Sequence, residues 1–496
     1  MSDGAPTPRR LHPATLIARW LRLVPQMVGG GAAFAATMGG WGRFLSFAAM
    51  AGGIGLVITL LWWWRFRYTL AEREIIIESG VLNRQRRVIP FDRVQDIAIE
   101  RRVIARLFGT ARVKVETGGA SSDEGLLDMI GLAEAQALRD RIRRGHSPTP
   151  VAGMAAEEPL LFRMDLSRIL AAGLFNFSLL FLAAIFAVVQ NLEQLGFVRV
   201  RDWINPRTAD TAAGFFNLRN SLALLAALVV LGLVYGVVRT VSREFGFKLT
   251  RTGGGDAAAG APPPPPGFRR RRGLFTLSDV VIPIRRTQVG LIESGPIARQ
   301  LGWFALAFQT LGAETKEGGV QAVAPFARMD EILPILTEAG FPVPPERSTF
   351  TRIPRRALWR WAAPFFLVGA TATAAAFLIA PGAGVAGGLL LAAGFYAAFR
   401  WRKHGFALDD RALFVRAGLL KRRMWIIPFE KAQTISVTQG PVQRRLRLAS
   451  LLLDTAGASS MRSPEIVDLD AAEAEALAAK LLSLFHRSRS EAKPSQ

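Results

Sequence analysis

One pattern occurs three times along the chain: GVLNRQRRVIPFDRVQ at 80–95, GLFTLSDVVIPIRRTQ at 273–288 and GLLKRRMWIIPFEKAQ at 418–433. A shift of 338 positions lays 68–122 over 406–460 without a gap and gives 17 identities in 55 positions. About four would be expected from ordinary composition. A shift of 193 positions lays 80–120 over 273–313 with 15 identities in 41. The chain is therefore built from internal repeats.

Eight positions are identical in all three copies, and we interpret them as a structural signature. They are Gly80/Gly273/Gly418, Ile89/Ile282/Ile427, Pro90/Pro283/Pro428, Gln95/Gln288/Gln433, Arg106/Arg299/Arg444, Thr117/Thr310/Thr455, Gly119/Gly312/Gly457 and Ala120/Ala313/Ala458.

Each copy is predicted to contain several strands followed by one helix. The β-branched run at 74–78 ends at a Ser-Gly turn, and 112–116 alternates apolar and polar residues, as strands do. The proline at position 90 favours an edge strand or a bulge there. Residues 132–143 and 471–485 have helical composition, and Pro334 predicts a kinked or later helix in the middle copy.

These motifs resemble the bacterial pleckstrin-homology-like (PH-like) domain, a membrane-flanked domain of bacterial proteins. The likeness rests on Arg67–Leu70, the strand up to Gly80, and Ile89–Pro90–Phe91 with Gln95, and it is equally good in the third copy. The middle copy is degenerate, because Ile284 replaces the Phe. The resemblance implies a β-sandwich or barrel capped by a C-terminal helix, with no established enzymatic activity.

Six apolar stretches are predicted to cross a membrane, at 23–42, 44–64, 169–189, 221–238, 361–380 and 384–399. They fall into three hairpins. Arginines flank the outer ends of every pair, so we expect these ends and both termini to be cytoplasmic. The expected fold is an α+β membrane protein of the cell inner membrane, multi-pass, in which six transmembrane helices alternate with three PH-like domains.

The predicted segments follow from these assignments. They are a cytoplasmic N-terminal segment at 1–22, hairpin 1 at 23–64, PH-like domain 1 at 65–145, a linker at 146–168, hairpin 2 at 169–238 with an extracytoplasmic loop at 190–220, PH-like domain 2 at 239–341 with a Gly/Pro insertion at 253–266, a linker at 342–360, hairpin 3 at 361–399, PH-like domain 3 at 400–486 and a disordered tail at 487–496.

Composition argues against most chemistry. The chain of 496 residues has no Cys and four His, so thiolate and His-rich metal sites are not expected. No Walker-type loop or nucleophile elbow is present, and we predict no catalytic residues, no metal and no cofactor: the protein is not expected to be an enzyme. The net charge of +23 suits an anionic surface, but aromatic residues are not interleaved for base stacking, so nucleic acid is not an expected partner.

Basic residues cluster around the same hairpin in each copy. The clusters are Arg84, Arg86 and Arg87 in the first, Arg269, Arg270, Arg271 and Arg272 in the middle, and Lys421, Arg422 and Arg423 in the third. Near the anionic cytoplasmic leaflet each basic residue contributes about 1 kcal/mol. We therefore predict contact with lipid head groups at these residues.

Three functions remain open. The first is a non-enzymatic scaffold or accessory protein whose domains bind membrane-associated protein partners and anionic lipids. The second is a lipid-sensing or lipid-handling protein. The third is a transporter or channel subunit, which the absence of Asp, Glu and Lys from the span centres disfavours.

Overall fold

The computed structural model describes residues 8–21, 41–71, 73–80, 83–117, 125–145, 158–176, 218–253, 266–310, 319–346, 349–378, 383–455 and 464–491. The chain divides into two compact units. Unit 1 contains Met1–Pro264 and Arg269–Val281, and unit 2 contains Pro265–Phe268 and Ile282–Gln496. The boundary therefore lies inside the middle copy.

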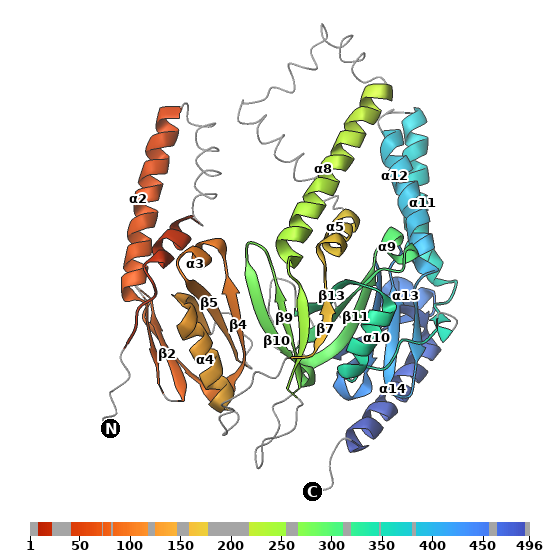
Figure 1. Cartoon of the computed structure of the whole chain (residues 1–496). Coiled ribbons are helices and arrows are strands. Elements are labelled where there is room, and N and C mark those ends of the chain that lie inside the picture. Colours follow the sequence, from red (N-terminus) through yellow and green to blue (C-terminus); the bar gives the residue numbers. More distant parts are fainter. Residues whose placement is uncertain are drawn as a thin grey trace. The chain divides into compact units, whose positions relative to one another are not determined.

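The described elements repeat in one order (Figure 1): three strands, a 3₁₀ turn, a strand, a short helix, two strands and a longer helix. In the first copy these are β1 (Arg67–Leu70), β2 (Glu74–Ser79), β3 (Gln85–Pro90), η1 (Phe91–Arg93), β4 (Val94–Arg101), α3 (Val103–Leu107), β5 (Thr110–Thr117), β6 (Gly125–Gly131) and α4 (Leu132–Gly145). In the middle segment they are β8 (Lys248–Thr252), β9 (Gly267–Arg272), β10 (Leu277–Pro283), η3 (Ile284–Arg286), β11 (Thr287–Ser294), α9 (Pro296–Gln300), β12 (Phe304–Thr310), β13 (Val320–Ala327) and α10 (Met329–Glu338). In the third they are β15 (Gly405–Leu408), β16 (Ala412–Ala417), β17 (Arg422–Pro428), η5 (Phe429–Lys431), β18 (Ala432–Thr438), α13 (Pro441–Arg445), β19 (Leu448–Thr455), β20 (Glu465–Asp470) and α14 (Ala471–Glu491).

The first copy folds around one apolar core between its two sheets and α4. Inward residues of the first sheet, such as Ile75 and Ile77, meet those of the second, such as Val113 and Val115. Leu138 and other residues on one face of α4 close the core. The third copy builds the same arrangement with α14. This is the sandwich with a C-terminal helix that the resemblance implied.

The sheets do not stop at the boundaries of the copies. The described strands form sheets in the orders β1-β2-β3, β6-β5-β4-β10-β9-β8-β7, β13-β12-β11-β17-β16-β15-β14 and β18-β19-β20. The two additional edge strands are β7 (Leu160–Arg163) and β14 (Thr351–Arg352). The described sheets therefore continue from one predicted domain into the next: β4 pairs with β10 of the next copy, and β11 pairs with β17 of the copy after it.

Both junctions use the same register. In the first, Arg101 lies opposite Leu277 and Glu100 opposite Ser278. The repeat places the equivalent residue 193 positions later for the first-copy strand and 145 positions later for the middle-copy strand. The equivalent pairs are then Ser294 with Arg422 and Glu293 with Arg423, which are the pairs observed at the second junction. The repeat thus extends to the interface between copies.

The signature residues shape the turn between the second and third strands and the start of the fourth. Gly80, Gly273 and Gly418 have φ of +101°, +114° and +94°. A Cβ at each would lie 1.8 to 2.0 Å from a backbone carbonyl oxygen three residues later, so only glycine fits. The signature prolines end the third strand and precede the 3₁₀ turns with φ near −65°. Gln95, Gln288 and Gln433 each fall at a register shift of the fourth strand.

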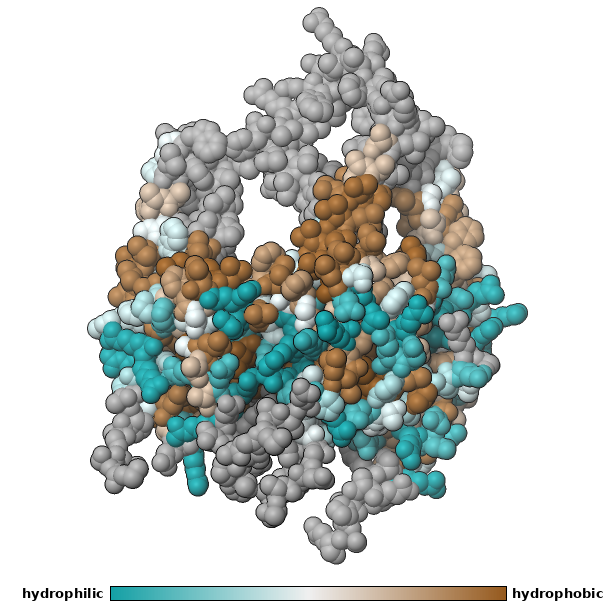
Figure 2. Space-filling view, viewed as in Figure 1, coloured by the Kyte–Doolittle hydropathy of each residue, from teal (hydrophilic) through white to brown (hydrophobic). Residues whose placement is uncertain are grey.

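Long apolar helices carry the membrane prediction. They are α2 (Trp41–Arg65), α8 (Leu218–Glu244), α11 (Ala357–Leu378) and α12 (Ala383–Trp401), together with the shorter α5 (Leu166–Phe175). Among the described residues, two spans are long and apolar enough to cross a membrane, Ala48–Arg65 in α2 and Ala226–Glu244 in α8. Only 6% and 17% of these spans is buried, whereas the core helix of a soluble protein would be mostly buried. Figure 2 shows the apolar surface of α8.

Six spans are thus more than the described residues show. Most of the predicted spans at 23–42 and 169–189 lies outside the described residues, as does most of the predicted loop at 190–220 and of the insertion at 253–266. The helices α11 and α12 pack as a pair: a Cβ on Gly387 would lie 2.3 Å from Thr373 Oγ1. In the middle copy α10 begins at Met329 and contains Pro334, and α14 continues to Glu491, past the boundary of 487 that we set for the tail.

Buried contacts fix the start of α11 to the third copy. Asp468 is fully buried and accepts hydrogen bonds from Arg360 Nε at 2.8 Å and Gln443 Nε2 at 2.6 Å. At the matching place in the first copy, Ala14 and Ala18 of the helix at 14–21 pack against Met129. In both copies, the segment before a predicted span is thus seated on the sheet domain.

We expect Gly418→Ala to destabilise the protein by about 1–3 kcal/mol, because it forces a Cβ into the left-handed turn against the carbonyl of Lys421. The measurement is thermal unfolding of the full chain in detergent. The control is Gly388→Ala, since a Cβ there meets nothing within 4 Å. Equal melting temperatures for the two variants would show that the turn does not need its glycine.

Candidate functional site

The basic cluster of the first copy is open to solvent. Arg84, Arg86 and Arg87 are all exposed on or just before β3. Arg86 approaches Glu78 at 3.6 Å, and Arg87 Nη2 donates to Gln85 Oε1 at 3.3 Å. Both contacts lie within the first sheet and leave these side chains accessible.

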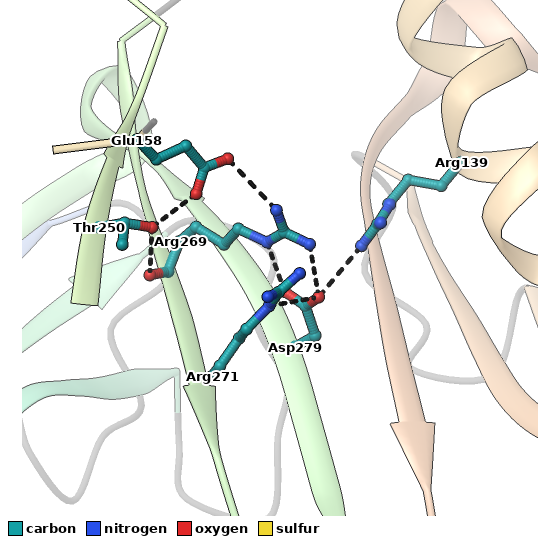
Figure 3. Close-up of polar contacts among 6 residues, drawn as sticks. All are labelled: Arg139, Glu158, Thr250, Arg269, Arg271 and Asp279. Carbon is teal, nitrogen blue, oxygen red and sulfur yellow. Dashed lines mark hydrogen bonds and ion pairs between the residues drawn. The ribbon is translucent and has the colours of Figure 1, made fainter. Parts of the chain in front are cut away.

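The middle cluster is built into an ion-pair network (Figure 3). Arg269 donates from Nε and Nη2 to the two carboxylate oxygens of Asp279 at 2.9 and 2.8 Å. Its Nη1 donates to Glu158 at 3.2 Å, and Thr250 Oγ1 donates to the other oxygen of Glu158 at 2.6 Å. Arg139, from α4 of the first copy, approaches Asp279 at 3.3 Å. The network therefore ties the first copy to the strands of the middle one, beside the β4–β10 junction.

Electrostatics hold Asp279 in its charged form. Burial by itself would raise the pKa of this carboxyl group, but the hydrogen bond from Arg269 and the charges of Arg269, Arg271 and Arg139 outweigh it and lower the pKa to about 2. The carboxylate is thus ionised at any physiological pH.

The rest of the middle cluster is divided between the interior and the surface. Arg270 is buried, and Arg272 donates to the buried Glu244 at 2.8 Å. Arg271 contacts Asp279 at 3.2 Å and remains more than half exposed. Of the four predicted lipid contacts in this copy, Arg271 is therefore the one that solvent reaches most.

The third cluster is partly neutralised in the same way. Glu293 of β11 accepts from Lys421 at 2.7 Å and from Arg423 at 2.9 Å, across the second junction. Arg422 lies opposite Ser294 in the same junction. A strand of the preceding copy thus pairs with the third strand of the middle and third copies, whereas β3 has only β2 beside it among the described strands. Lipid contact at the three clusters stays a prediction, and accessibility differs between them.

A second feature lies where the hairpins meet the long helices. Gly273 N donates to Phe245 O at 2.8 Å and Leu274 N donates to Ser242 O at 3.0 Å, so the β9–β10 turn rests on the end of α8. Arg106 Nη1 donates to Leu274 O at 2.7 Å, which holds α3 beside this turn. The apolar residues here point outward; we call them the apolar fringe. They are Val103, Leu107, Phe108 and Phe275, with Leu107 80% exposed.

Positive charge accumulates at the end of α12. The pKa of Lys403 is lowered by burial and by the nearby charges of Arg422, Arg299, Arg402 and Arg416. An anion bound among these groups would relieve their mutual repulsion. This cluster includes Arg299, one of the signature residues.

Sequence reasoning missed the acidic partners. Asp279, Glu293 and Glu158 decide which predicted basic residues are paired with a carboxylate. The first and middle copies both have Glu at the same position, Glu100 and Glu293. This shared acidic residue was a sequence signal, since both lie on the fourth strand, which pairs with the next copy. The described residues contain no group of three or more His, Cys, Asp or Glu that could hold a metal.

Sheets that pack as sandwiches, each with a C-terminal helix and joined to long exposed apolar helices, define a membrane protein with PH-like sheet domains. The bacterial PH domain model matches residues 19–146 and 363–485, just over half of the chain. The chain belongs to this family, with two matched copies. The middle segment is not matched.

One relative is similar over most of the chain. It is the UPF0699 transmembrane protein YdbT of Bacillus subtilis (strain 168), 22% identical over 340 residues, or 62% of this chain. The matched region spans 64% of the relative's length. No solved structure matches the chain.

Asp279→Asn is expected to destabilise the full chain by about 2 kcal/mol at neutral pH. A carboxyl group with a depressed pKa stabilises the fold above its unfolded value near 4, and this stabilisation is lost as the pH falls toward 2. The difference between wild type and variant, measured by thermal unfolding, should therefore shrink below pH 4.

The matched control is Asp165→Asn, because Asp165 forms an exposed pair with Arg163 at 3.5 Å. That variant should unfold within about 0.5 kcal/mol of wild type. A pH-independent gap between Asp279→Asn and wild type would mean that the charge of Asp279 does not stabilise the junction.

Proposed function

We propose that this chain is a non-enzymatic scaffold of the inner membrane, with both termini cytoplasmic, whose PH-like domains bind membrane-associated protein partners through open strand edges. One observation carries the proposal. The same strand edges that are covered at the two internal junctions are exposed at β3 and β18, the outermost members of the described series. An exposed edge presents unpaired N–H and C=O groups, which a partner strand can bind.

The proposal includes three PH-like modules and six spans. The middle segment supports a third module, because it repeats the order of elements and the junction register of the others. The paired α11 and α12, and α5 packed on α8 where a Cβ on Gly173 would lie 2.6 Å from Val237, support hairpins in addition to the two candidate spans.

A structural role agrees with how the polar residues are used. At the junctions, the carboxylates of Asp279 and Glu293 form ion pairs with arginine or lysine. At the base of α11, Asp468 accepts hydrogen bonds from Arg360 and Gln443. Each group holds two parts of the chain together.

Lipid handling is the second candidate, and the apolar fringe favours it. Exposed apolar side chains beside a membrane helix lower their free energy by entering the interface, at about 25 cal/mol per Å² buried. The positive charge around Lys403 suits anionic head groups. Such contact would orient the scaffold against the leaflet.

The scaffold is tested by extracting the tagged full chain into polymer nanodiscs and identifying co-purifying proteins and lipids by mass spectrometry. We expect at least one reproducible protein partner, reduced several-fold by Val88→Lys on the β3 edge. The control is Val343→Lys, a site away from strands whose exposure of 54% is close to the 48% of Val88. Enrichment of one anionic lipid with no protein partner would instead support lipid handling.

The apolar fringe is tested with spin labels, since the chain has no cysteine. A label at Phe275→Cys should be more accessible to oxygen than to a polar nickel reagent in nanodiscs. A label at Leu160→Cys, equally exposed at 55%, should show the reverse. Equal polar accessibility at both sites would place the fringe in water.

A further inference from the structure

Each internal junction joins equivalent strands. The fourth strand of one copy, β4 or β11, pairs with the third strand of the next copy, β10 or β17. Within the described part of the chain this series has two ends. The third strand of the first copy, β3, has β2 on one side, and the fourth strand of the third copy, β18, has β19 on one side; no described strand covers the other edge of either.

The burial of equivalent residues differs sharply between the junctions and the ends. In the fourth strand, Ile99 and Ile292 are 5% and 4% exposed, whereas the equivalent Val437 is 40% exposed. In the third strand, Ile426 is fully buried, whereas the equivalent Val88 is 48% exposed. Apolar residues that the internal junctions cover are therefore still present at the ends, where this chain leaves them in solvent.

We propose that β18 of one chain pairs with β3 of a second copy of the same chain, antiparallel and in the register of the internal junctions. This rests on the proposed scaffold function and names its partner. The register predicts four opposed pairs, which are Thr438 with Gln85, Val437 with Arg86, Ser436 with Arg87, and Ile435 with Val88.

Charge favours this head-to-tail arrangement over a symmetric one. The strand β18, AQTISVT, has no charged residue, so the arginines of β3 meet no like charge there. Pairing β3 with another β3 would bring arginines against arginines, which destabilises strands. Among the described strands, one chain offers one open third-strand edge and one open fourth-strand edge, so head-to-tail pairing continues into rings or filaments.

Anchoring in a membrane favours pairing between the strand edges of neighbouring chains. If several chains are anchored by their apolar helices in the same bilayer, the open strand edges of neighbouring chains can pair within the plane of the membrane. The internal junctions already join copies that carry their own long helices, α2, α8 and α11–α12. The same contact between chains thus needs no new kind of surface.

The proposal differs from the reading in which β3 and β18 are protected ends. Arginines on an edge strand can prevent pairing. The position equivalent to Glu100 and Glu293 is Thr438 in β18, so the acidic partner of the internal junctions is absent. A protected end would stay unpaired in the membrane, and this outcome can be measured.

Because the chain has no native cysteine, disulfide cross-linking can read the register. Two full-length chains with different tags are co-expressed, one with Gln85→Cys and the other with Thr438→Cys, and their membranes are oxidised. Opposed residues at about 5.5 Å between Cα atoms form disulfides readily. We expect a cross-linked dimer that carries both tags.

The control replaces Thr438→Cys with Val437→Cys. Neighbouring strand residues point to opposite faces, so this cysteine should cross-link to Gln85→Cys several-fold less. Disulfides between two Gln85→Cys chains, or between two Thr438→Cys chains, would establish a symmetric contact and overturn the proposal. No cross-linked product, with both thiols reactive to a maleimide, would overturn it in favour of protected ends.

Substitutions of opposite charge at Val437 distinguish an effect on pairing from an effect on folding. This side chain is exposed in the single chain, so Lys and Glu should be tolerated equally there. Opposite Arg86 of a second copy, Val437→Lys should reduce cross-linking between Gln85→Cys and Thr438→Cys, and Val437→Glu should preserve it. We expect a difference of about fivefold; equal yields would contradict the register.

The outcome is distinguishable from that of the scaffold itself. In one outcome, the two-tag dimer is absent while mass spectrometry finds another protein whose recovery falls with Val88→Lys. That result would support the proposed scaffold function and contradict the proposal that the partner is a second copy of the chain. If both are absent, the open edges bind no protein and the scaffold fails as well.

Discussion

Backbone pairing between copies, β4 with β10 and β11 with β17, is the constraint on which the remaining structure depends. Each pairing joins a group of three strands to a group of four and so forms a sheet of seven. It agrees with where the two units divide: most of the first half of the middle copy belongs to the unit that contains β4, and the second half belongs to the unit that contains β17. At the second junction the pairing also neutralises part of the basic hairpin, because β11 places Glu293 beside Lys421 and Arg423.

Much of the fold was readable from local chemistry. The glycine at 80, 273 and 418 required a turn that only glycine can adopt, and the strands and C-terminal helices around it followed from alternation and composition. The family resemblance is confirmed for the first and third copies. These features depend on residues close in sequence, so a single sequence is enough to predict them.

The joining of sheets was not predictable in this way. An edge strand and a strand at a junction have similar residues, and β3 and β17 share the same pattern although one is open and one is covered. The partners of Arg269 are Glu158 and Asp279, 111 and 10 positions away. Whether an arginine is accessible or neutralised depends on which strand lies beside it. The predicted lipid contacts at 269–272 therefore look alike in sequence and differ in the structure.

The common register of the two junctions has a consequence for how such a chain can arise. A copy inserted into the series needs no new complementary surface, because its third strand fits the preceding copy and its fourth strand fits the following one. Duplication of a whole repeat, together with its helices, would lengthen the protein at once without further adjustment of the interface. A cut inside a repeat, by contrast, leaves a half-sandwich whose core has lost its second sheet.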